Sequence, residues 1–532
     1  MMPSRWLAAC CLKGECDRMG EILQPYELKS MPGMVIEDEG MNGMLRQLME
    51  LRPHFSLDYT WDDIGTAQLM NDVYEEQIRY CPQNDSWYIW DGRWAKQDDA
   101  TTVSDMLQTL LNVLNLYCKE IIAEEEDETK REPLEQYHKY VKSIRRNNAM
   151  RAILEVYKTR VRLAQKDMDS DPYLLNTPSG AFDLRTLEPV TDLRGGHNVT
   201  KMTSCSLPTP LNHHCDRWGQ FIDQIMSGNA EKAKFLQRAL GYSILGVNRE
   251  ECMFIAYGAK TRNGKGTLFS TIQRVLSDDY VGTSPPDLIC EGKQGRVTDF
   301  NAPQPTLAQL VGKRIVMMSE SAKEVRLASA SMKTMTGRDS MLTRGLFEKP
   351  FRFVPQFSIW LNTNHLPAVT DETVFLSNRI WVIEFNRHFE EWEQDRDLKE
   401  VFTDPENMPT ILEWLVEGCR DYLENGLNPP ECVRKATENY RKTHDRIGNF
   451  IEEYCLLGED KKILRGELYA AYRRWCALAD NQYKPLGSTT FYNEIAMRGF
   501  HTKREHDGWF IEGIKERPAA TETGTGKIKL GG

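Results

Sequence analysis

The sequence predicts an α/β fold built around a phosphate-binding loop, and three observations lead to this prediction. Residues 252–257 form a short apolar run typical of a strand, a turn with glycine follows, and apolar residues then recur at helical spacing. A second apolar run, residues 315–318, is soon followed by Glu320, and a third run ends near Asn364. A strand, a glycine-rich loop and a helix form a P-loop, and the carboxyl ends of neighbouring parallel strands are where ligands bind in such sheets.

The whole chain has the composition of a globular protein of several domains. Its 532 residues are too many for one domain, and we expect three or four. No apolar run reaches the ~18 residues that a membrane span needs, so we expect no membrane partner. The net charge of −11 argues against a uniformly basic surface for nucleic acid, but it leaves a local basic groove open.

The 13 cysteines are scattered and lack the paired C-x-x-C spacing of a zinc site. Two loose clusters could hold Zn²⁺, but reduced thiols in a polar loop are the preferred interpretation. The clusters are Cys10, Cys11 and Cys16, and Cys205 with His213, His214 and Cys215.

The amino-terminal half predicts an unassigned segment, residues 1–56, and then an α+β region, residues 57–205. A helix is expected from Asp63 to Tyr74, and residues 86–94 predict a hairpin with an Asp-Gly turn. The tryptophans of this hairpin could stack on bases, but a small hydrophobic core is the preferred interpretation. They are Trp87, Trp90 and Trp94.

Helices are expected next, before a stretch of short strands. Residues 103–122 have apolar positions at helical spacing, and residues 139–163 are rich in Lys and Arg. The basic stretch either contacts DNA phosphates or forms a solvated helix face. Pro, Gly and Asn within residues 173–186 indicate short strands and turns, and residues 218–245 predict a helical segment that leads into the loop strand.

The glycine-bearing turn has the residues that a nucleotide phosphate needs. Backbone N–H groups at a helix start point at an anion, and the helix dipole adds to them. The expected contacts to ATP come from Asn263, Gly264, Lys265, Gly266 and Thr267, with Lys265 reaching the β- and γ-phosphates and Thr267 placed for Mg²⁺. The match to G-x-x-x-x-G-K-[ST] is imperfect, since Ala259 and Gly266 replace the expected types and Gly258 lies one residue too early. A glycine-containing turn with a surface lysine is the alternative.

Two further polar residues follow predicted strands. Glu320 could hold Mg²⁺ or polarise the attacking water, and capping of its strand is the alternative. The amide of Asn364 could bond a γ-phosphate or its attacking water, and a turn-forming role is the alternative.

Three cations complete the candidate site. Arg344 and Lys349 border a predicted hairpin tip with an aromatic residue, which suits a loop that grips single-stranded DNA, and an ordinary exposed turn is the alternative. Arg379 precedes another strand and could reach a neighbouring subunit's phosphate as an arginine finger.

The carboxy-terminal part predicts three segments. Residues 396–455 are expected to form helices after the core. Residues 456–515 predict two helices, 465–476 and 488–497, and a hairpin, 501–512, which together suggest a winged-helix-like domain. Lys503 and Arg504 would lie on its wing, where DNA binding and a packing lid are both open. Residues 516–532 are expected to be a disordered tail.

Together these motifs resemble the superfamily 3 helicase domain of the phage and plasmid primase-helicases related to the poxvirus primase-helicase. The matching pieces are Asn263-Gly264-Lys265, Gly312-Lys313-Arg314 before Ser319-Glu320, residues 333–339, and Asn362-Thr363-Asn364-His365-Leu366-Pro367. Residues 60–94, 174–186 and 411–454 resemble the flanking regions of that family. The departures are the longer loop with Gly266 and a single acid, Glu320, where many relatives have two.

The resemblance implies an AAA+-like core over residues 206–395 in an ATP-driven DNA helicase of a phage, plasmid or other mobile element. It implies a homo-hexamer with single-stranded or forked DNA in its pore, movement from 3′ to 5′, and Mg²⁺ as cofactor. Lys265, Glu320 and Asn364 would serve catalysis, with Arg379 acting in trans. Residues 1–56 are too few for a primase-polymerase domain. We therefore expect a separate primase or polymerase as partner, and the cytoplasm of a bacterial host as the location.

Two other functions fit the same residues. A P-loop kinase or transferase for small molecules would hydrolyse ATP without regard to DNA. A replication initiator would bind an origin through residues 456–515 with weak or no ATPase activity.

Overall fold

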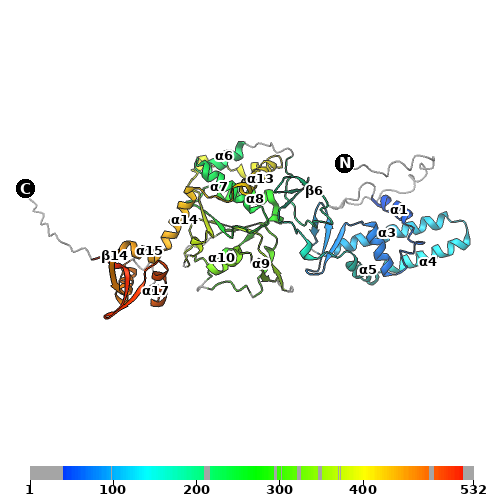
Figure 1. Ribbon diagram of the computed structural model, residues 1–532. Helices are drawn as coiled ribbons and strands as arrows, with labels where there is room; N and C mark the ends of the chain where they lie inside the picture. Colours follow the sequence, from blue (N-terminus) through cyan, green and yellow to red (C-terminus); the bar gives the residue numbers. More distant parts are fainter. Residues whose placement is uncertain are drawn as a thin grey trace, which may run out of the picture. The chain divides into compact units, whose positions relative to one another are not determined.

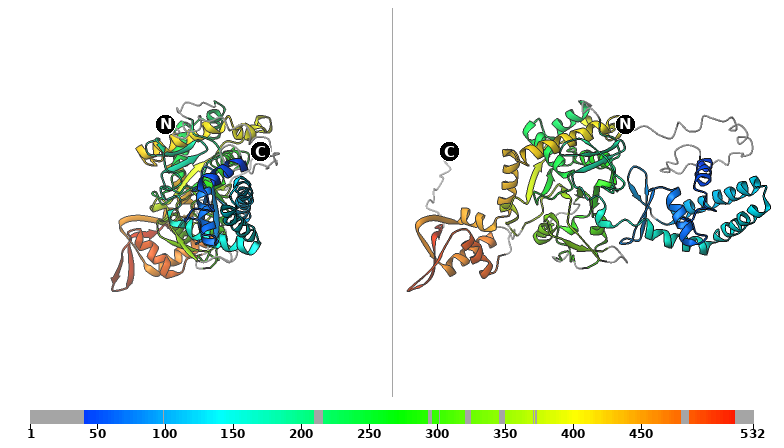
Figure 2. Two further views of the ribbon diagram at one scale, coloured as in Figure 1. Left: turned by 90° about the vertical axis from the view of Figure 1, so that its right-hand side faces the viewer. Right: turned by 45° about the vertical axis from the view of Figure 1, so that its right-hand side comes forward.

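The computed structural model describes most of the chain, and contacts divide it into two units (Figures 1 and 2). The first unit comprises residues 1–168 and 194–200, and the second comprises residues 169–193 and 201–532. The described residues are 40–97, 99–208, 216–292, 296–300, 302–319, 325–344, 350–369, 371, 373–478 and 485–518.

The first unit combines helices with a small antiparallel sheet whose strand order is β1-β2-β3. The predicted helix and hairpin are confirmed, as α2 and as the β2–β3 pair joined through Asp91-Gly92. The elements are α1 (Gly40–Leu51), α2 (Asp63–Val73), β1 (Ile78–Cys81), β2 (Ser86–Trp90), β3 (Trp94–Lys96), α3 (Thr101–Glu124), α4 (Glu128–Ile144) and α5 (Asn147–Arg160).

Local chemistry explains where these elements begin and what they bury. The Asp62 carboxylate caps α2 by accepting the Gly65 N–H at 2.8 Å. Trp87 and Trp94 are buried, which confirms the core interpretation for these two, whereas Trp90 is half-buried. The Trp94 indole donates to the Arg194 carbonyl at 3.1 Å and thereby ties residues 194–200 to this unit.

The second unit opens with the antiparallel strands β4 (Leu174–Thr177), β5 (Gly180–Asp183) and β6 (Pro189–Val190). The sequence predicts one amino-terminal region over residues 57–205, whereas these strands pack with the second unit. Arg314 links them to the core, since its buried guanidinium donates to the carbonyls of Leu174 and Ile244.

A five-stranded, all-parallel sheet forms the core of the second unit and confirms the α/β prediction. The strand order is β13-β7-β12-β9-β8, so β7, the strand before the predicted phosphate loop, is flanked on both sides. The strands are β7 (Met253–Tyr257), β8 (Val281–Ser284), β9 (Ile315–Ser319), β12 (Ser358–Thr363) and β13 (Ile380–Glu384).

Helices cover both faces of this sheet, which is why its strands are continuous apolar runs. Phe254, Ala256 and Trp360 belong to one hydrophobic cluster, and Met253 and Ile255 belong to another, so alternate residues enter opposite layers. Figure 1 shows one group of helices on one side of the sheet and a second group on the other. The first group is α6 (Asp216–Ile225), α7 (Ala230–Ser243), α8 (Lys265–Tyr280) and α13 (Met408–Asn425), and the second is α9 (Pro305–Gln309) and α10 (Ser329–Thr336).

The outer edge of the sheet at β13 is covered by α14 (Glu431–His444). The Val382 N–H points away from β7 and donates to the buried Thr437 hydroxyl of α14 at 3.0 Å. A covered edge strand cannot pair with another chain. The remaining elements of this region are β10 (Met341–Thr343), β11 (Phe351–Phe353), α11 (Thr373–Leu376) and α12 (Leu398–Thr403).

The carboxy-terminal residues form helices and a three-stranded antiparallel sheet of order β14-β16-β15. Both predicted helices and the predicted hairpin are confirmed, as α16, α17 and the β15–β16 pair. Strand β14 was not predicted. The elements are α15 (Arg446–Tyr454), β14 (Cys455–Leu464), α16 (Arg465–Leu478), α17 (Ser488–Met497), β15 (Thr502–Glu505) and β16 (Gly508–Glu516).

Candidate phosphate-binding site

The carboxyl ends of β7, β12 and β9 lie side by side, at the edge where open α/β sheets bind ligands. The loop after β7 begins with Gly258, whose N–H donates to the Thr363 carbonyl at 3.2 Å. Asn364 follows β12 directly, and Ser319, the last residue of β9, pairs in register with Asn362. The topology therefore brings together three segments that are far apart in the sequence.

Two glycines give this loop its shape. Gly264 has φ of +82° immediately before α8, and a Cβ there would lie 2.3 Å from Cγ2 of Ile225. A Cβ on Gly258 would lie 2.2 Å from Nδ2 of Asn263 and 2.8 Å from Nζ of Lys265. The same Cβ would lie 2.9 Å from the backbone oxygen of Phe385, which cannot move aside as a side chain can, so this close approach favours glycine at position 258.

Lys265 is buried at the start of α8, with 4% of its surface exposed, so it is not a surface lysine. Its ammonium group donates to Oδ1 of Asn364 at 3.0 Å and to the Gly258 carbonyl at 3.4 Å. Burial lowers the pKa of Lys265 from 10.5 to about 8. Among the described residues, no carboxylate lies within hydrogen-bond distance of this ammonium group. A buried cation of this kind is suited to an incoming anion.

The start of α8 offers further donors. Asn263 is buried, donates to the Lys260 carbonyl at 2.6 Å, and thereby fixes the loop. The Lys265 N–H donates to Oδ1 of Asn263 at 3.5 Å. No side chain of the described residues caps the N–H groups that follow, and the first N–H groups of a helix have no partner within the helix. Gly266 is exposed with open space at its Cβ position, and Thr267 lies half-buried in the same turn.

Not every residue predicted for the site is found at this loop. Glu320 and Lys349 lie outside the described residues. Arg344 is exposed and follows β10 directly. Arg379 lies at the amino end of β13, opposite the loop, where Nη2 contacts Oε2 of Glu251 at 2.7 Å and Nη1 donates to the Thr336 hydroxyl at 3.1 Å. Arg379 therefore does not join the loop of its own chain, and its role in trans stays a prediction.

The sequence reasoning did not identify the segment after β13, which lies against the loop. His388 Nδ1 lies 2.7 Å from the Thr261 carbonyl, and the Phe389 N–H donates to the Arg262 carbonyl at 2.8 Å. A cavity of about 590 Å³ opens here, which is enough for a small-molecule ligand. Its lining is polar: Gln224, Ser227, Gly228, Lys260, Asn386, Arg387, His388 and Glu390. The available signal was the polar run Asn-Arg-His directly after a predicted strand.

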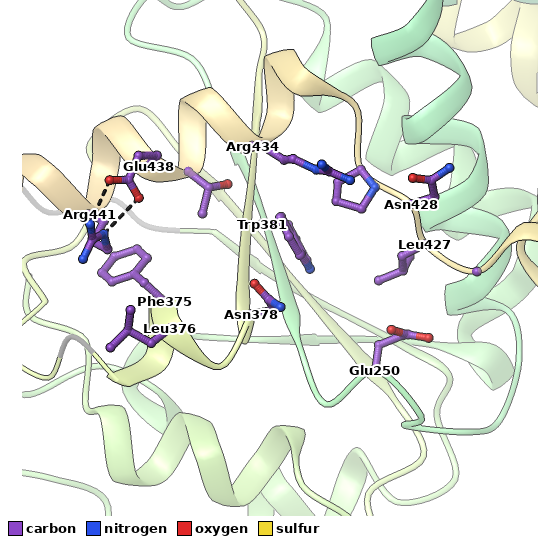
Figure 3. A pocket seen from close by; sticks show the side chains of 13 residues that line it. Glu250, Phe375, Leu376, Asn378, Trp381, Leu427, Asn428, Arg434, Glu438 and Arg441 are labelled. Carbon is purple, nitrogen blue, oxygen red and sulfur yellow. Dashed lines mark hydrogen bonds and ion pairs between the residues drawn. The ribbon is translucent and has the colours of Figure 1, made fainter.

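A second cavity, of about 700 Å³, lies at the covered edge of the sheet (Figure 3). Trp381 of β13 and Arg434 of α14 line it, and Arg441 is held by Glu438 at 2.9 Å. Asn378 and Glu250, which precede β13 and β7, place this cavity toward the amino ends of the strands. It is therefore separate from the phosphate loop.

Within the described ranges, no group of three or more His, Cys, Asp or Glu residues could hold a metal ion. Cys205 is a buried free thiol, and the other members of both predicted cysteine clusters lie outside those ranges. None of the described helices is long and apolar enough to cross a membrane.

Comparison with known proteins gives matches at both ends of the chain. The family described as D5 N terminal like matches residues 67–227, and the family described as poxvirus D5 protein-like matches residues 442–515. These matches flank the phosphate loop without including it.

Several viral proteins that are named putative helicases are similar to this chain. The protein of Acanthamoeba polyphaga mimivirus is 24% identical over 472 residues, which are 82% of this chain and 47% of that protein. The protein of frog virus 3 is 26% identical over 296 residues, which are 52% of this chain and 29% of that protein. The protein of Sputnik virophage is 27% identical over 210 residues, which are 37% of this chain and 26% of that protein. The chain thus spans less than half the length of each relative.

These relatives belong to viruses of eukaryotic hosts, whereas a bacterial host is expected from the sequence. The bacterial host stays a prediction. Among solved structures, the C-terminal region of NrS-1 aligns with 85% of this chain and 99% of that chain, at 11% identity and a TM-score of 0.44.

Proposed function

Because the chain carries both regions of the poxvirus D5-like primase-helicase family, we propose that it is an ATP-dependent DNA helicase that acts in viral replication. The observation that supports this most is the buried Lys265 ammonium, held 3.0 Å from Asn364 at the ligand-binding edge of a parallel sheet. A helicase needs such a site, because it couples ATP hydrolysis to movement along DNA.

The proposed chemistry starts from the contacts of the free site. The β- and γ-phosphates replace Gly258 and Asn364 as acceptors for Lys265, which then neutralises phosphate charge. Asn364, released from Lys265, bonds the γ-phosphate or orients the attacking water. The uncapped N–H groups at the start of α8 bind phosphate oxygens.

The hydroxyl of Thr267 and the carboxylate of Glu320 are oxygen ligands of the kind that Mg²⁺ prefers. Thr267 lies in the first turn of α8, beside the proposed phosphate position. Bound there, Mg²⁺ neutralises charge that develops on the phosphates. The polar cavity beside residues 386–390 is the proposed place for the rest of the nucleotide.

We further propose a superfamily 3, AAA+-like assembly in which ATP lies between the subunits of a hexameric ring. Arg379 acts on a neighbouring subunit's phosphate, and Arg344 and Lys349 contact single-stranded DNA in the pore. The exposed position of Arg344 after β10 supports its part. Movement from 3′ to 5′ follows from the resemblance.

The carboxy-terminal domain is proposed to be a winged helix. Its order of helix, strand, two helices and hairpin, with β16 between β14 and β15, supports this proposal. Lys503 on β15 contacts Glu512 at 3.0 Å, and Lys462 contacts Glu505 at 2.6 Å. These pairs reduce the positive charge that the wing offers to DNA.

Unwinding of forked DNA tests the proposed function. A labelled duplex with a single-stranded 3′ tail is expected to be separated in the presence of ATP and Mg²⁺, and a duplex with only a 5′ tail is not. The Lys265→Ala variant is expected to unwind neither. Unchanged unwinding by this variant would contradict a functional role for the loop, whereas unwinding from the 5′ tail alone would contradict only the polarity.

A further inference from the structure

A band of exposed cations lies along the helix pair α3–α4 in the first unit, outside the phosphate site. We define the α3–α4 basic band as Lys119 on α3, Lys142 on α4, and Arg145 and Arg146 in the turn between α4 and α5. All four are exposed. Lys142, Arg145 and Arg146 lie within the stretch 139–163, for which the sequence leaves open DNA contact or a solvated face. Lys119 is distant from them in the sequence and joins the band because α3 packs against α4.

A neutral amide, not a carboxylate, holds the side chain of Arg145 in this band. Nη2 of Arg145 donates to Oδ1 of Asn112 on α3 at 2.6 Å. Nε2 of His138 on α4 lies 3.0 Å from Oδ1 of Asn115 on α3. The ion pairs formed within residues 40–97 and 99–168 include none of the four cations of the band. Their charges are thus not offset by a contacting acid, as they are on the wing.

The positive charges of the band act on the side chain of His138. The pKa of His138 is lowered first by burial, and then by the charges of Lys142 and Lys119. Both lysines therefore lie close to His138, from two different helices. Helix α5 begins at Asn147, directly after the band, and no side chain caps its start, so its dipole adds positive potential at this end.

Most acidic residues of this helix pair lie toward its turn. Glu120 directly follows Lys119 on α3, the run Glu124–Glu128 lies at the turn between α3 and α4, and Glu135 lies one turn before His138. Positive potential is therefore concentrated toward the end of α4. A surface of this kind is complementary to a polyanion with regularly spaced charges, which a phosphodiester backbone provides.

We propose that the α3–α4 basic band binds the phosphodiester backbone of DNA, at a site distinct from the ATPase core. The proposal rests on the proposed function only in naming DNA as the polyanion. Contacts to phosphates position a protein on its nucleic acid without reading its sequence. The band thus gives the first unit a role as a sequence-independent DNA clamp.

Fluorescence anisotropy of the full chain with single-stranded and duplex oligonucleotides, over a range of salt concentrations, tests this proposal. The triple variant Lys119→Gln, Lys142→Gln, Arg145→Gln removes three charges from the band. The slope of log affinity against log salt for single strands is expected to fall by about 2, and the affinity at moderate salt by about tenfold or more. Circular dichroism and the melting temperature check that the variant is folded.

The matched control is Lys96→Gln, Arg162→Gln, Lys166→Gln, which removes three exposed charges from other parts of the same unit. It is expected to keep the parental affinity and salt slope. A folded band variant with parental DNA affinity and slope would overturn the proposal, and so would equal losses in the control.

Failure of this proposal can be distinguished from failure of the helicase proposal. If the band variant loses DNA affinity while the parent hydrolyses no ATP under any condition, the band stands and the helicase proposal fails. If the parent unwinds DNA and the band variant binds as the parent does, the helicase proposal stands and the band fails.

Discussion

At the scale of single residues, the site depends on an unusual lysine. The Lys265 ammonium is buried against two neutral oxygens, and burial lowers its pKa from 10.5 to about 8. Between these two pH values the unfolded chain binds more protons than the folded chain, so stability from this residue rises with pH across that window. Below pH 8 the folded protein holds a buried charge that a bound phosphate would compensate.

The pH dependence of nucleotide binding follows from this lysine. ATP is expected to bind the charged form, so its affinity falls as pH rises through 8 and is about tenfold weaker at pH 9 than at pH 7. Isothermal titration calorimetry measures the affinity at each pH. Lys265→Arg is the control, because a guanidinium stays charged over this range and any binding it retains is flat with pH. A flat profile for the parent would contradict a compensating role for Lys265.

The Asn364 amide is expected to serve hydrolysis more than binding. Asn364→Ala should lower kcat by about 10²–10³-fold, the cost of one lost polar contact to a transition state, and should change the ATP affinity only a few-fold. Steady-state kinetics and calorimetry measure the two effects. The neighbouring variant His365→Ala is the matched control and should keep parental kcat. Parental kcat for Asn364→Ala would remove Asn364 from the mechanism.

Single residues also show what the sequence can predict about the site. Gly264, Lys265 and Asn364 were recognisable because each stands at a motif position beside an apolar strand. The role of Gly258 was not recognisable, because it depends on the close approach of the Phe385 backbone, which is distant in the sequence. The position of Arg379 could not be predicted either, because its contact with Glu251 joins residues 128 apart in the chain.

Among the elements, the turn into α8 contains two glycines that differ in backbone conformation and in the space around them. Gly264 has a positive φ and no room for a Cβ, whereas Gly266 lies in the first helical turn with open space around it. The loop therefore needs one glycine for its shape and carries the other without a steric requirement in the free protein.

Paired substitutions test this contrast. Gly264→Ala is expected to lower the free energy of unfolding by ~1–3 kcal/mol, since it adds strain and a clash with Ile225. Gly266→Ala is expected to raise it by ~0.5–1 kcal/mol, because alanine loses less backbone entropy in a helix. Urea denaturation measures both. Equal destabilisation by the two variants would show that the described loop geometry is wrong.

The covered edge of β13 provides a test of the sheet. Thr437→Val keeps the side-chain shape but leaves the Val382 N–H without its acceptor, which should cost ~1–3 kcal/mol of unfolding free energy. Thr437→Ser keeps the hydroxyl and should cost less. Thermal and urea unfolding compare the two. A valine variant as stable as the serine variant would mean that this bond contributes little.

Most elements could be predicted because their patterns are local. Apolar runs indicated β7, β9, β12 and β13, and Asp-Gly indicated the first hairpin. The segment expected as helical over residues 218–245 is two helices, since Ser227 and Gly228 have positive φ and Asn229 caps the second. Strand β14 was missed because residues 458–462 are polar and no alternation indicates a strand. Its pairing with β16 is what makes it a strand.

At the scale of the whole molecule, the order of the strands could not be read from the sequence. The last strand, β13, lies beside the first, β7, and no local pattern records that pairing. The division of the chain is likewise non-local, because residues 194–200 belong with the first unit and residues 169–193 with the second. The regions matched by the two families lie on both sides of the proposed phosphate loop and do not include it.

A DNA helicase couples ATP hydrolysis to its contact with DNA, so ATP hydrolysis is measured with and without single-stranded DNA. The parent and Lys265→Ala are measured in parallel, with Mg²⁺ and at pH 7. We expect hydrolysis by the parent that DNA stimulates, and no stimulated hydrolysis by Lys265→Ala. Hydrolysis by the parent that is indifferent to DNA would contradict a helicase and favour a kinase or transferase, and equal activity of the two proteins would contradict the phosphate site itself.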